Sequence, residues 1–189
     1  MRKLFAIALS LVLLLGLVAC GQAMPATAQL SFTGITGVWF TEELPGDSVC
    51  ADGDVLRVGR TYDGKDIFAL VRMPLDEELR AEDVREAWLC LKILENNGAM
   101  ALRAGPVSGP WDADFTQAQA MSLAEDLRGV RQALTPDDWL HIDVTGFVRA
   151  WLGGEENHGI VLFEGNGSTE TAFAATGENE PKLEIIISK

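Results

Sequence analysis

The only histidines in the chain are His141 and His158, and this limits the side chains available for general acid–base chemistry near neutral pH. His141 falls on the outward side of an expected strand. His158 falls in an expected turn after Asn157, where it is either a turn residue or a ligand contact. The nucleophile, zinc-protease and phosphate-loop motifs G-x-S-x-G, H-E-x-x-H and G-x-x-x-x-G-K are absent. The sequence therefore predicts a protein that is not an enzyme.

Carboxylates are the most numerous reactive groups, and several occur as adjacent pairs. The pairs are at 42–43, 77–78, 137–138 and 155–156. A glycosidase needs two carboxylates about 5–10 Å apart, so a hydrolase is one interpretation, whereas solvated surface loops are the simpler one. Asp52 and Asp54 could also offer oxygen ligands to a structural calcium ion, although an ordinary acidic turn is the simpler interpretation. No other cofactor is expected.

Five tryptophans are many for 189 residues, and exposed indole rings can stack against the apolar faces of sugar rings. Trp111, in a loop rich in glycine and proline, is the best candidate for an exposed ring. Trp88 falls on the second face of its strand, and Trp39 is ambiguous. Core packing is the alternative for each of them. Together with Asn157 and His158, these three tryptophans are the candidate ligand-binding residues.

The first twenty residues predict export and lipid anchoring. A short basic start precedes an apolar run from Leu4 to Leu17, which is too short to span a bilayer. Leu-Val-Ala-Cys at 17–20 resembles the lipobox of bacterial lipoproteins, in which the cysteine is acylated. We expect a signal peptide with a helical apolar segment (1–19), a lipidated Cys20 with a flexible tether (20–35), and one domain (36–189). The alternative is an ordinary secretory signal cut near Ala28.

Export also bears on the two remaining cysteines and on the expected partners. Outside the cytosol, Cys50 and Cys90 indicate a disulfide, with two buried free thiols as the alternative. The net charge of -13 disfavours nucleic acid, and the only membrane contact expected is the lipid anchor of a protein on the outer side of a bacterial membrane.

Short alternating strands with turns between them make up most of the chain after residue 36. In 84–94, Leu89, Leu91 and Ile93 form the expected core face. Asn96 to Gly98 is expected to be a hairpin turn into 99–104. A short helix is expected near 145–152, with Thr145 as its cap, and 105–138 is expected to be mainly loop. The pattern predicts an all-β fold, an antiparallel β-sandwich of the jelly-roll kind.

A family resemblance follows from these segments. WLHIDVTGFVRAWLGGEENHGIVLF (139–163) resembles the signature of DNRLRE-type domains, also grouped as carbohydrate-binding module family 96. The matching residues are Trp139, Asp143, Val144, Thr145, Val148, Trp151, Gly154, Asn157 and Gly159. Segments 56–75, 84–94 and 177–188 also follow the family pattern, so the resemblance covers about 36–188.

The resemblance implies a β-sandwich that binds carbohydrate. The leading expectation is therefore a non-catalytic surface module that binds polysaccharide or a cell-surface glycan, or presents an adhesive face. The alternative is a structural sandwich that binds a protein of the cell envelope and has no glycan site.

Overall fold

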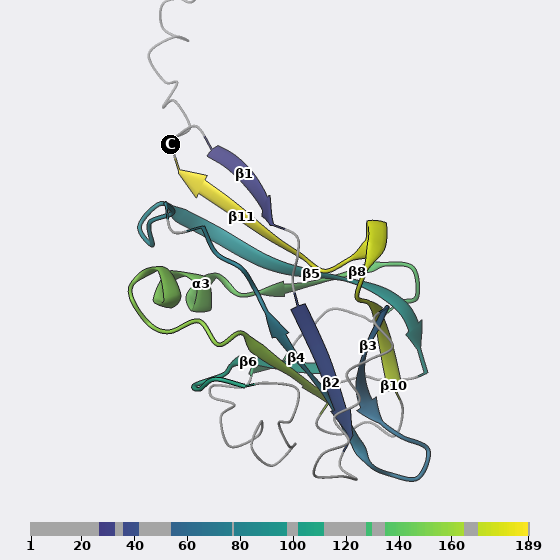
Figure 1. Ribbon diagram of the computed structural model, residues 1–189. Coiled ribbons are helices and arrows are strands. Elements are labelled where there is room, and N and C mark those ends of the chain that lie inside the picture. The colour runs from purple at the N-terminus through teal and green to yellow at the C-terminus, as the bar shows by residue number, and fades with distance from the viewer. Residues whose placement is uncertain are drawn as a thin grey trace, which may run out of the picture.

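The computed structural model describes residues 27–32, 36–41, 54–76, 78–97, 102–111, 128–129, 135–164 and 170–188. Within these ranges the chain is mostly antiparallel β-sheet with one α-helix (Figure 1). The strands are β1 (Thr27–Phe32), β2 (Thr36–Thr41), β3 (Val55–Arg60), β4 (Asp66–Arg72), β5 (Val84–Asn96), β6 (Leu102–Pro106), β7 (Arg128–Gly129), β8 (Trp139–Asp143), β9 (Ile160–Glu164), β10 (Glu170–Ala174) and β11 (Lys182–Ser188). The helix is α3 (Thr145–Leu152), and Gly177–Asn179 forms a single 3-10 turn.

The sheet curls so that β5 belongs to both of its parts. The first part has the order β1-β11-β5-β8, and every pairing in it is antiparallel. The second part continues from β5 through β10, β3, β4, β9, β6 and β7, with β2 also paired to β4. The 13 residues of β5 make this possible, because its first half pairs with β11 and β8 and its second half with β10.

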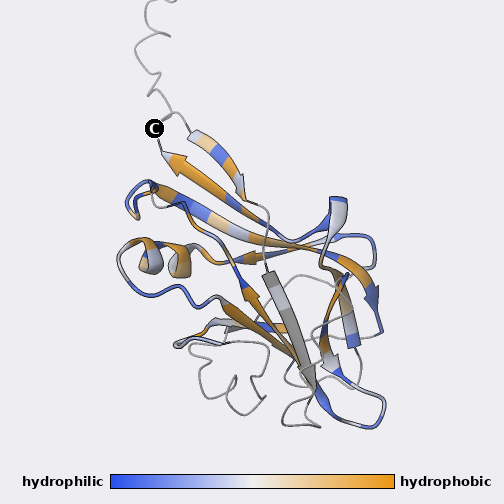
Figure 2. Cartoon of the chain, viewed as in Figure 1, coloured by the Kyte–Doolittle hydropathy of each residue, from blue (hydrophilic) through white to orange (hydrophobic). Residues whose placement is uncertain are grey.

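One hydrophobic core fills the inside of the curl. On β5, Leu89, Leu91 and Ile93 are fully buried, which confirms the predicted core face. β4 is buried on both faces over Ile67–Val71, as its unbroken apolar run predicts. Figure 2 shows hydrophobic stretches along the strands and hydrophilic residues in the connections between them. The core fixes which strand faces are left for solvent and for ligands.

The helix forms where it was predicted, but Thr145 has a different role. Val144, Val148 and Trp151 are buried at the expected helical spacing. Thr145 does not cap the helix, since Val144 is the N-cap and the Thr145 amide donates to the Asp143 carboxylate at 3.0 Å. Instead, the Thr145 hydroxyl accepts a hydrogen bond from the Ala87 amide at 2.9 Å. Thr145 therefore attaches the start of the helix to β5.

Two other expectations about local structure are corrected. The predicted hairpin after Asn96 does not form among the described residues, because β6 pairs with β9 and β7 rather than with β5. The range 27–32, placed in the flexible tether by the sequence, is strand β1 and pairs with β11 over six residues. The hydrophobic residues Leu30 and Phe32 lie in this strand, and Phe32 packs against the core.

Several sequence predictions fall outside the described residues. These are the signal peptide (1–19), Cys20, Cys50, Asp52 and the side chain of Trp39. Within the described ranges, no helix is both long enough and apolar enough to cross a membrane.

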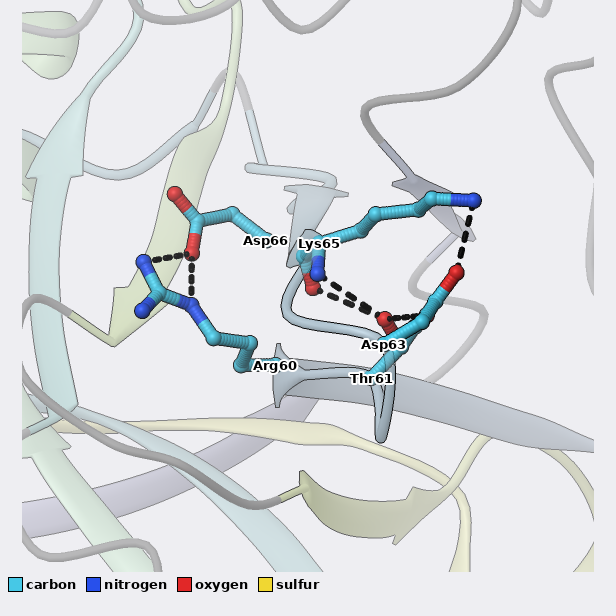
Figure 3. Close-up of polar contacts among 5 residues, drawn as sticks. All are labelled: Arg60, Thr61, Asp63, Lys65 and Asp66. Carbon is cyan, nitrogen blue, oxygen red and sulfur yellow. Dashed lines mark hydrogen bonds and ion pairs between the residues drawn. The ribbon is translucent and has the colours of Figure 1, made fainter.

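The β3–β4 hairpin has a tightly bonded turn at Asp63-Gly64. Gly64 has a φ of +89°, and its amide donates to the Thr61 carbonyl at 2.9 Å. Figure 3 shows the ion pairs that brace the turn, Arg60 with Asp66 and Lys65 with Asp63, both at 2.7 Å. Tyr62, within this turn, is fully exposed. The turn thus holds an exposed aromatic ring on a defined backbone.

Candidate functional site: the Trp139 face and the Trp111 corner

The structure brings together three of the residues predicted to bind a ligand, Trp111, Asn157 and His158. The indole nitrogen of Trp111 donates a hydrogen bond to the backbone carbonyl of His158 at 2.5 Å. The guanidinium of Arg72, at the end of β4, lies 4.7 Å from the centre of the Trp111 ring. We call Arg72, Trp111, Asn157, His158 and Gly159 the Trp111 corner.

Most polar groups of the Trp111 corner bond to backbone atoms. The Asn157 side chain donates to the Met73 carbonyl at 2.7 Å and accepts from the Gly159 amide at 3.0 Å. Arg72 donates to the Trp111 carbonyl at 3.1 Å. The His158 ring lies 2.9 Å from the exposed Glu156 carboxylate. Asn157 is therefore a turn-forming residue, and the corner joins the 157–159 turn to β4.

Trp88 lies elsewhere, on the outward face of the first part of the sheet. Its register partners are Glu184 on β11 and Asp143 on β8. In the next row, Cys90 lies between Lys182 and His141. The following row pairs Lys92 with Trp139. The outward positions of three strands thus form one continuous surface of aromatic, basic and acidic side chains.

At the centre of this surface is a shallow open depression of about 260 Å³. It is lined by Cys90, Trp139, His141, Lys182 and Glu184. The Lys182 ammonium lies 5.0 Å and the Lys92 ammonium 6.0 Å from the centre of the Trp139 ring. We call the five lining residues, with Trp88 and Lys92, the Trp139 face. An indole ring beside hydrogen-bonding side chains is the composition of a sugar-stacking site.

Cys90 forms the floor of the depression and carries a free thiol. Cys90 is only 2% exposed, in line with the alternative of a buried free thiol, but Cys50 lies outside the described residues, so the Cys50–Cys90 disulfide stays a prediction. Burial raises the pKa of the thiol from 9.0 to about 12, Glu184 adds to the rise, and Lys182 partly opposes it. Near neutral pH the group stays protonated, and a protonated thiol is a poor nucleophile and metal ligand.

Of the two predicted metal ligands, Asp54 lies within the described residues and has a structural contact. Its carboxylate accepts a hydrogen bond from the Thr176 hydroxyl at 2.7 Å, and its carbonyl accepts from the Ala175 amide. Among the residues with described positions, no group of three or more histidine, cysteine, aspartate or glutamate side chains could hold a metal ion. The calcium site remains a prediction that involves Asp52, outside the described ranges.

Sequence reasoning did not select Trp139, His141, Lys182 or Glu184. The alternation within 139–143 and 182–188 does place each of them on an outward face. What the sequence lacks is the register that sets β8 and β11 on either side of β5, because these strands lie about 50 and 90 residues further along the chain. The depression is a product of long-range pairing.

Fold and site define a mostly antiparallel β protein with an aromatic and polar outer face. No model of a known protein family matches the chain. No curated protein matches it either. The resemblance to DNRLRE-type domains therefore remains a prediction.

Proposed function

We propose that this chain is a non-catalytic, lipid-anchored surface module whose β-sandwich binds carbohydrate at the Trp139 face. The single observation that carries the proposal is the depression in which Trp139 lies beside His141, Lys182 and Glu184 on an outward sheet face. An indole supplies a flat apolar surface for a sugar ring, and the neighbouring side chains supply donors and acceptors for its hydroxyl groups.

The chemistry of the depression favours binding over turnover. The Cys90 thiol has a pKa of about 12 and lies at the floor. The thiolate is the reactive form of a cysteine, and the raised pKa keeps the Cys90 thiol protonated near neutral pH. A glycosidase needs two carboxylates, and Glu184 is the only carboxylate among the described residues that line the depression. These features suit a surface that holds a ligand without transforming it.

The curled sheet and its core support the finer fold proposal, an antiparallel sandwich of the jelly-roll kind. The first and second parts of the sheet share one hydrophobic cluster between them. Several residues of the DNRLRE-like pattern have structural roles in that arrangement: Val148 and Trp151 are buried, and Asn157 and Gly159 shape a turn. The family pattern therefore supports the fold, and the proposed glycan site depends on Trp139 and its neighbours.

Affinity electrophoresis tests the proposal. The mature acylated protein, purified in detergent, is run in native gels that each contain one polysaccharide, such as a β-glucan, xylan, mannan, pectin or soluble chitin derivative. We expect retardation by at least one polymer, and we expect Trp139→Ala to weaken it about tenfold, as loss of a central aromatic contact does. Trp111→Ala is the matched control. It removes an indole from the Trp111 corner and should leave retardation unchanged.

The alternative function predicts a different result. A sandwich that binds an envelope protein and has no glycan site would migrate equally in all gels while remaining folded, as judged by circular dichroism. That outcome would remove the carbohydrate proposal. Equal loss of retardation in Trp139→Ala and Trp111→Ala would place the glycan site away from the Trp139 face or would indicate general destabilisation, which thermal unfolding of each variant distinguishes.

A further inference from the structure

The two ends of the sheet differ in a way that bears on how the domain meets a membrane. At one end, Thr27 of β1 pairs with Ser188 of β11, and the Ser188 amide donates to the Asp83 carbonyl at 2.9 Å. At the same end, Arg149 of α3 donates to the Val84 carbonyl at 2.7 and 2.9 Å and to the Arg85 carbonyl at 3.1 Å. We call this connected group the anchor end. Its members are Thr27, Arg80, Asp83, Val84, Arg85, Arg149 and Ser188.

The β3–β4 hairpin lies at the opposite end. Strand β5 connects the two ends: Val84 is the register partner of Ile187, and Asn96 is the partner of Thr171. Thr171 in turn pairs with Val58, close to the hairpin that contains Tyr62. Thirteen strand residues would extend about 40 Å if straight. Figure 1 shows the chain end at β11 and the β3–β4 turn on opposite sides of the molecule.

Chain length limits the distance between a lipidated Cys20 and the sheet. Six residues, 21–26, separate Cys20 from Thr27. Fully extended, this segment reaches about 25 Å, which is shorter than the length of β5. An acylated Cys20 therefore keeps the anchor end close to the lipid surface and cannot allow the domain to turn over.

Charge favours the same orientation. The anchor end contains three arginines, Arg80, Arg85 and Arg149, and one acid, Asp83, whereas the whole chain has a net charge of -13. Glu82 and Glu86, close in sequence, bring the local charge to zero, still less negative than the chain as a whole. Even so, an anionic bilayer repels this end less than the rest of the molecule.

We infer that the domain stands on the membrane with its anchor end toward the lipid and with the β3–β4 hairpin, carrying Tyr62, as its outermost part. This inference rests on the proposed lipidation of Cys20. It places the Trp139 face on the flank of the domain, since the strands that form that face run between the two ends. The proposed glycan site is then open to polymers beside the domain, and the β3–β4 hairpin is the part of the domain furthest from the membrane.

Energy transfer to lipid tests the orientation. The mature acylated protein, carrying Tyr62→p-azidophenylalanine or Glu82→p-azidophenylalanine coupled to one dye, is reconstituted in vesicles of phosphatidylcholine and phosphatidylglycerol with a short-range acceptor on their headgroups. We expect several-fold higher transfer from position 82, in the turn of the anchor end, than from position 62. A Gly-Ser insertion of about ten residues between positions 24 and 25 should lower transfer from position 82, because the tether lengthens.

The two proposals fail in different ways. If the protein floats with the vesicles but transfer from position 62 equals or exceeds that from position 82, the orientation is wrong and the anchor stands. If the wild-type protein separates from the vesicles as the Cys20→Ser variant is expected to do, the anchor itself is wrong, and the orientation is overturned with it. An insertion that leaves transfer from position 82 unchanged also overturns the orientation argument.

Discussion

The Trp139 face and the Trp111 corner contain similar residue types but use them differently. Each combines a half-buried tryptophan with a histidine and a basic side chain within 5.0 Å of the indole centre. In the corner, Trp111, Asn157 and Arg72 all bond to backbone atoms, so the tryptophan helps to hold a turn in place. In the face, Lys92 donates to the backbone carbonyl of Asp137, whereas the Lys182 ammonium lies over the Trp139 ring, a contact that can rearrange around a ligand.

The comparison separates a structural aromatic cluster from a candidate binding surface. Residue type alone would place both in the same class, and the sequence favoured the corner. The partner atoms distinguish them, because a polar group bonded to the main chain must lose that bond before it can bind a ligand. Mutations in the corner should therefore affect folding first, and mutations in the face should affect binding first.

The largest expected effect is from Gly159→Ala in the Trp111 corner. Gly159 has a φ of +87°, and a Cβ there would lie 2.3 Å from the Val71 carbonyl oxygen. The clash is with backbone, so the variant should lose about 3 kcal/mol or more of unfolding free energy in urea titrations. Gly154→Ala is the matched control. Its φ is +108° with nothing within 4 Å, so it should cost only about 1 kcal/mol. Equal losses would show that β4 does not constrain the turn.

A smaller loss is expected from Asn157→Ala. The change leaves the Met73 carbonyl and the Gly159 amide without their side-chain partner, at a cost of about 2 kcal/mol. His158→Ala is the comparison variant. It removes the contact with exposed Glu156 and the packing of an imidazole that is 16% exposed, and it keeps the carbonyl that Trp111 uses, so the loss should be about 1 kcal/mol, smaller than that of Asn157→Ala. Thermal unfolding of both variants measures the difference, and a larger effect at His158 would contradict the assigned roles.

Local patterns predicted much of the fold. The helix at 145–152, the buried β4 and the core face of β5 follow from the spacing of apolar residues within one segment. The prediction of a hairpin after Asn96 was wrong because turn residues indicate a reversal of the chain but not the strand with which the next segment pairs. The prediction that Thr145 caps the helix was wrong because its hydroxyl bonds to the backbone of Ala87 in β5, 58 residues earlier in the chain.

The candidate site was predicted only in part. Trp88 was correctly expected off the core face, and Trp111, Asn157 and His158 do lie together. Their backbone partners, such as the Met73 carbonyl 84 residues from Asn157, have no counterpart in local sequence. Composition therefore identified the side chains able to bind a ligand, and the long-range register determined which of them face solvent side by side.

The pH dependence of stability tests whether the Cys90 thiol is buried beneath the Trp139 face. Because the pKa of folded Cys90 is raised from 9.0 to about 12, the folded state holds the thiol proton more tightly than the unfolded state. This contribution is fully present below pH 9 and is lost as pH rises from 9 to 12. Wild-type protein should therefore lose more stability in urea over that range than Cys90→Ala. Parallel curves, or fast alkylation of the native thiol at pH 8, would show that Cys90 is accessible to solvent.

The smallest expected effects come from removing the two cations that contact the tryptophans, Lys182 and Arg72. Lys182→Met keeps most of the aliphatic length and removes the ammonium 5.0 Å from Trp139, so it should cost about 0.5 kcal/mol. Arg72→Met removes both the cation over Trp111 and the hydrogen bond to its carbonyl, so about 1 kcal/mol is expected. Urea titrations of the two variants under identical conditions resolve the order. If Lys182→Met proves the more destabilising, Lys182 is structural, and the Trp139 face would resemble the corner rather than a surface available to a ligand.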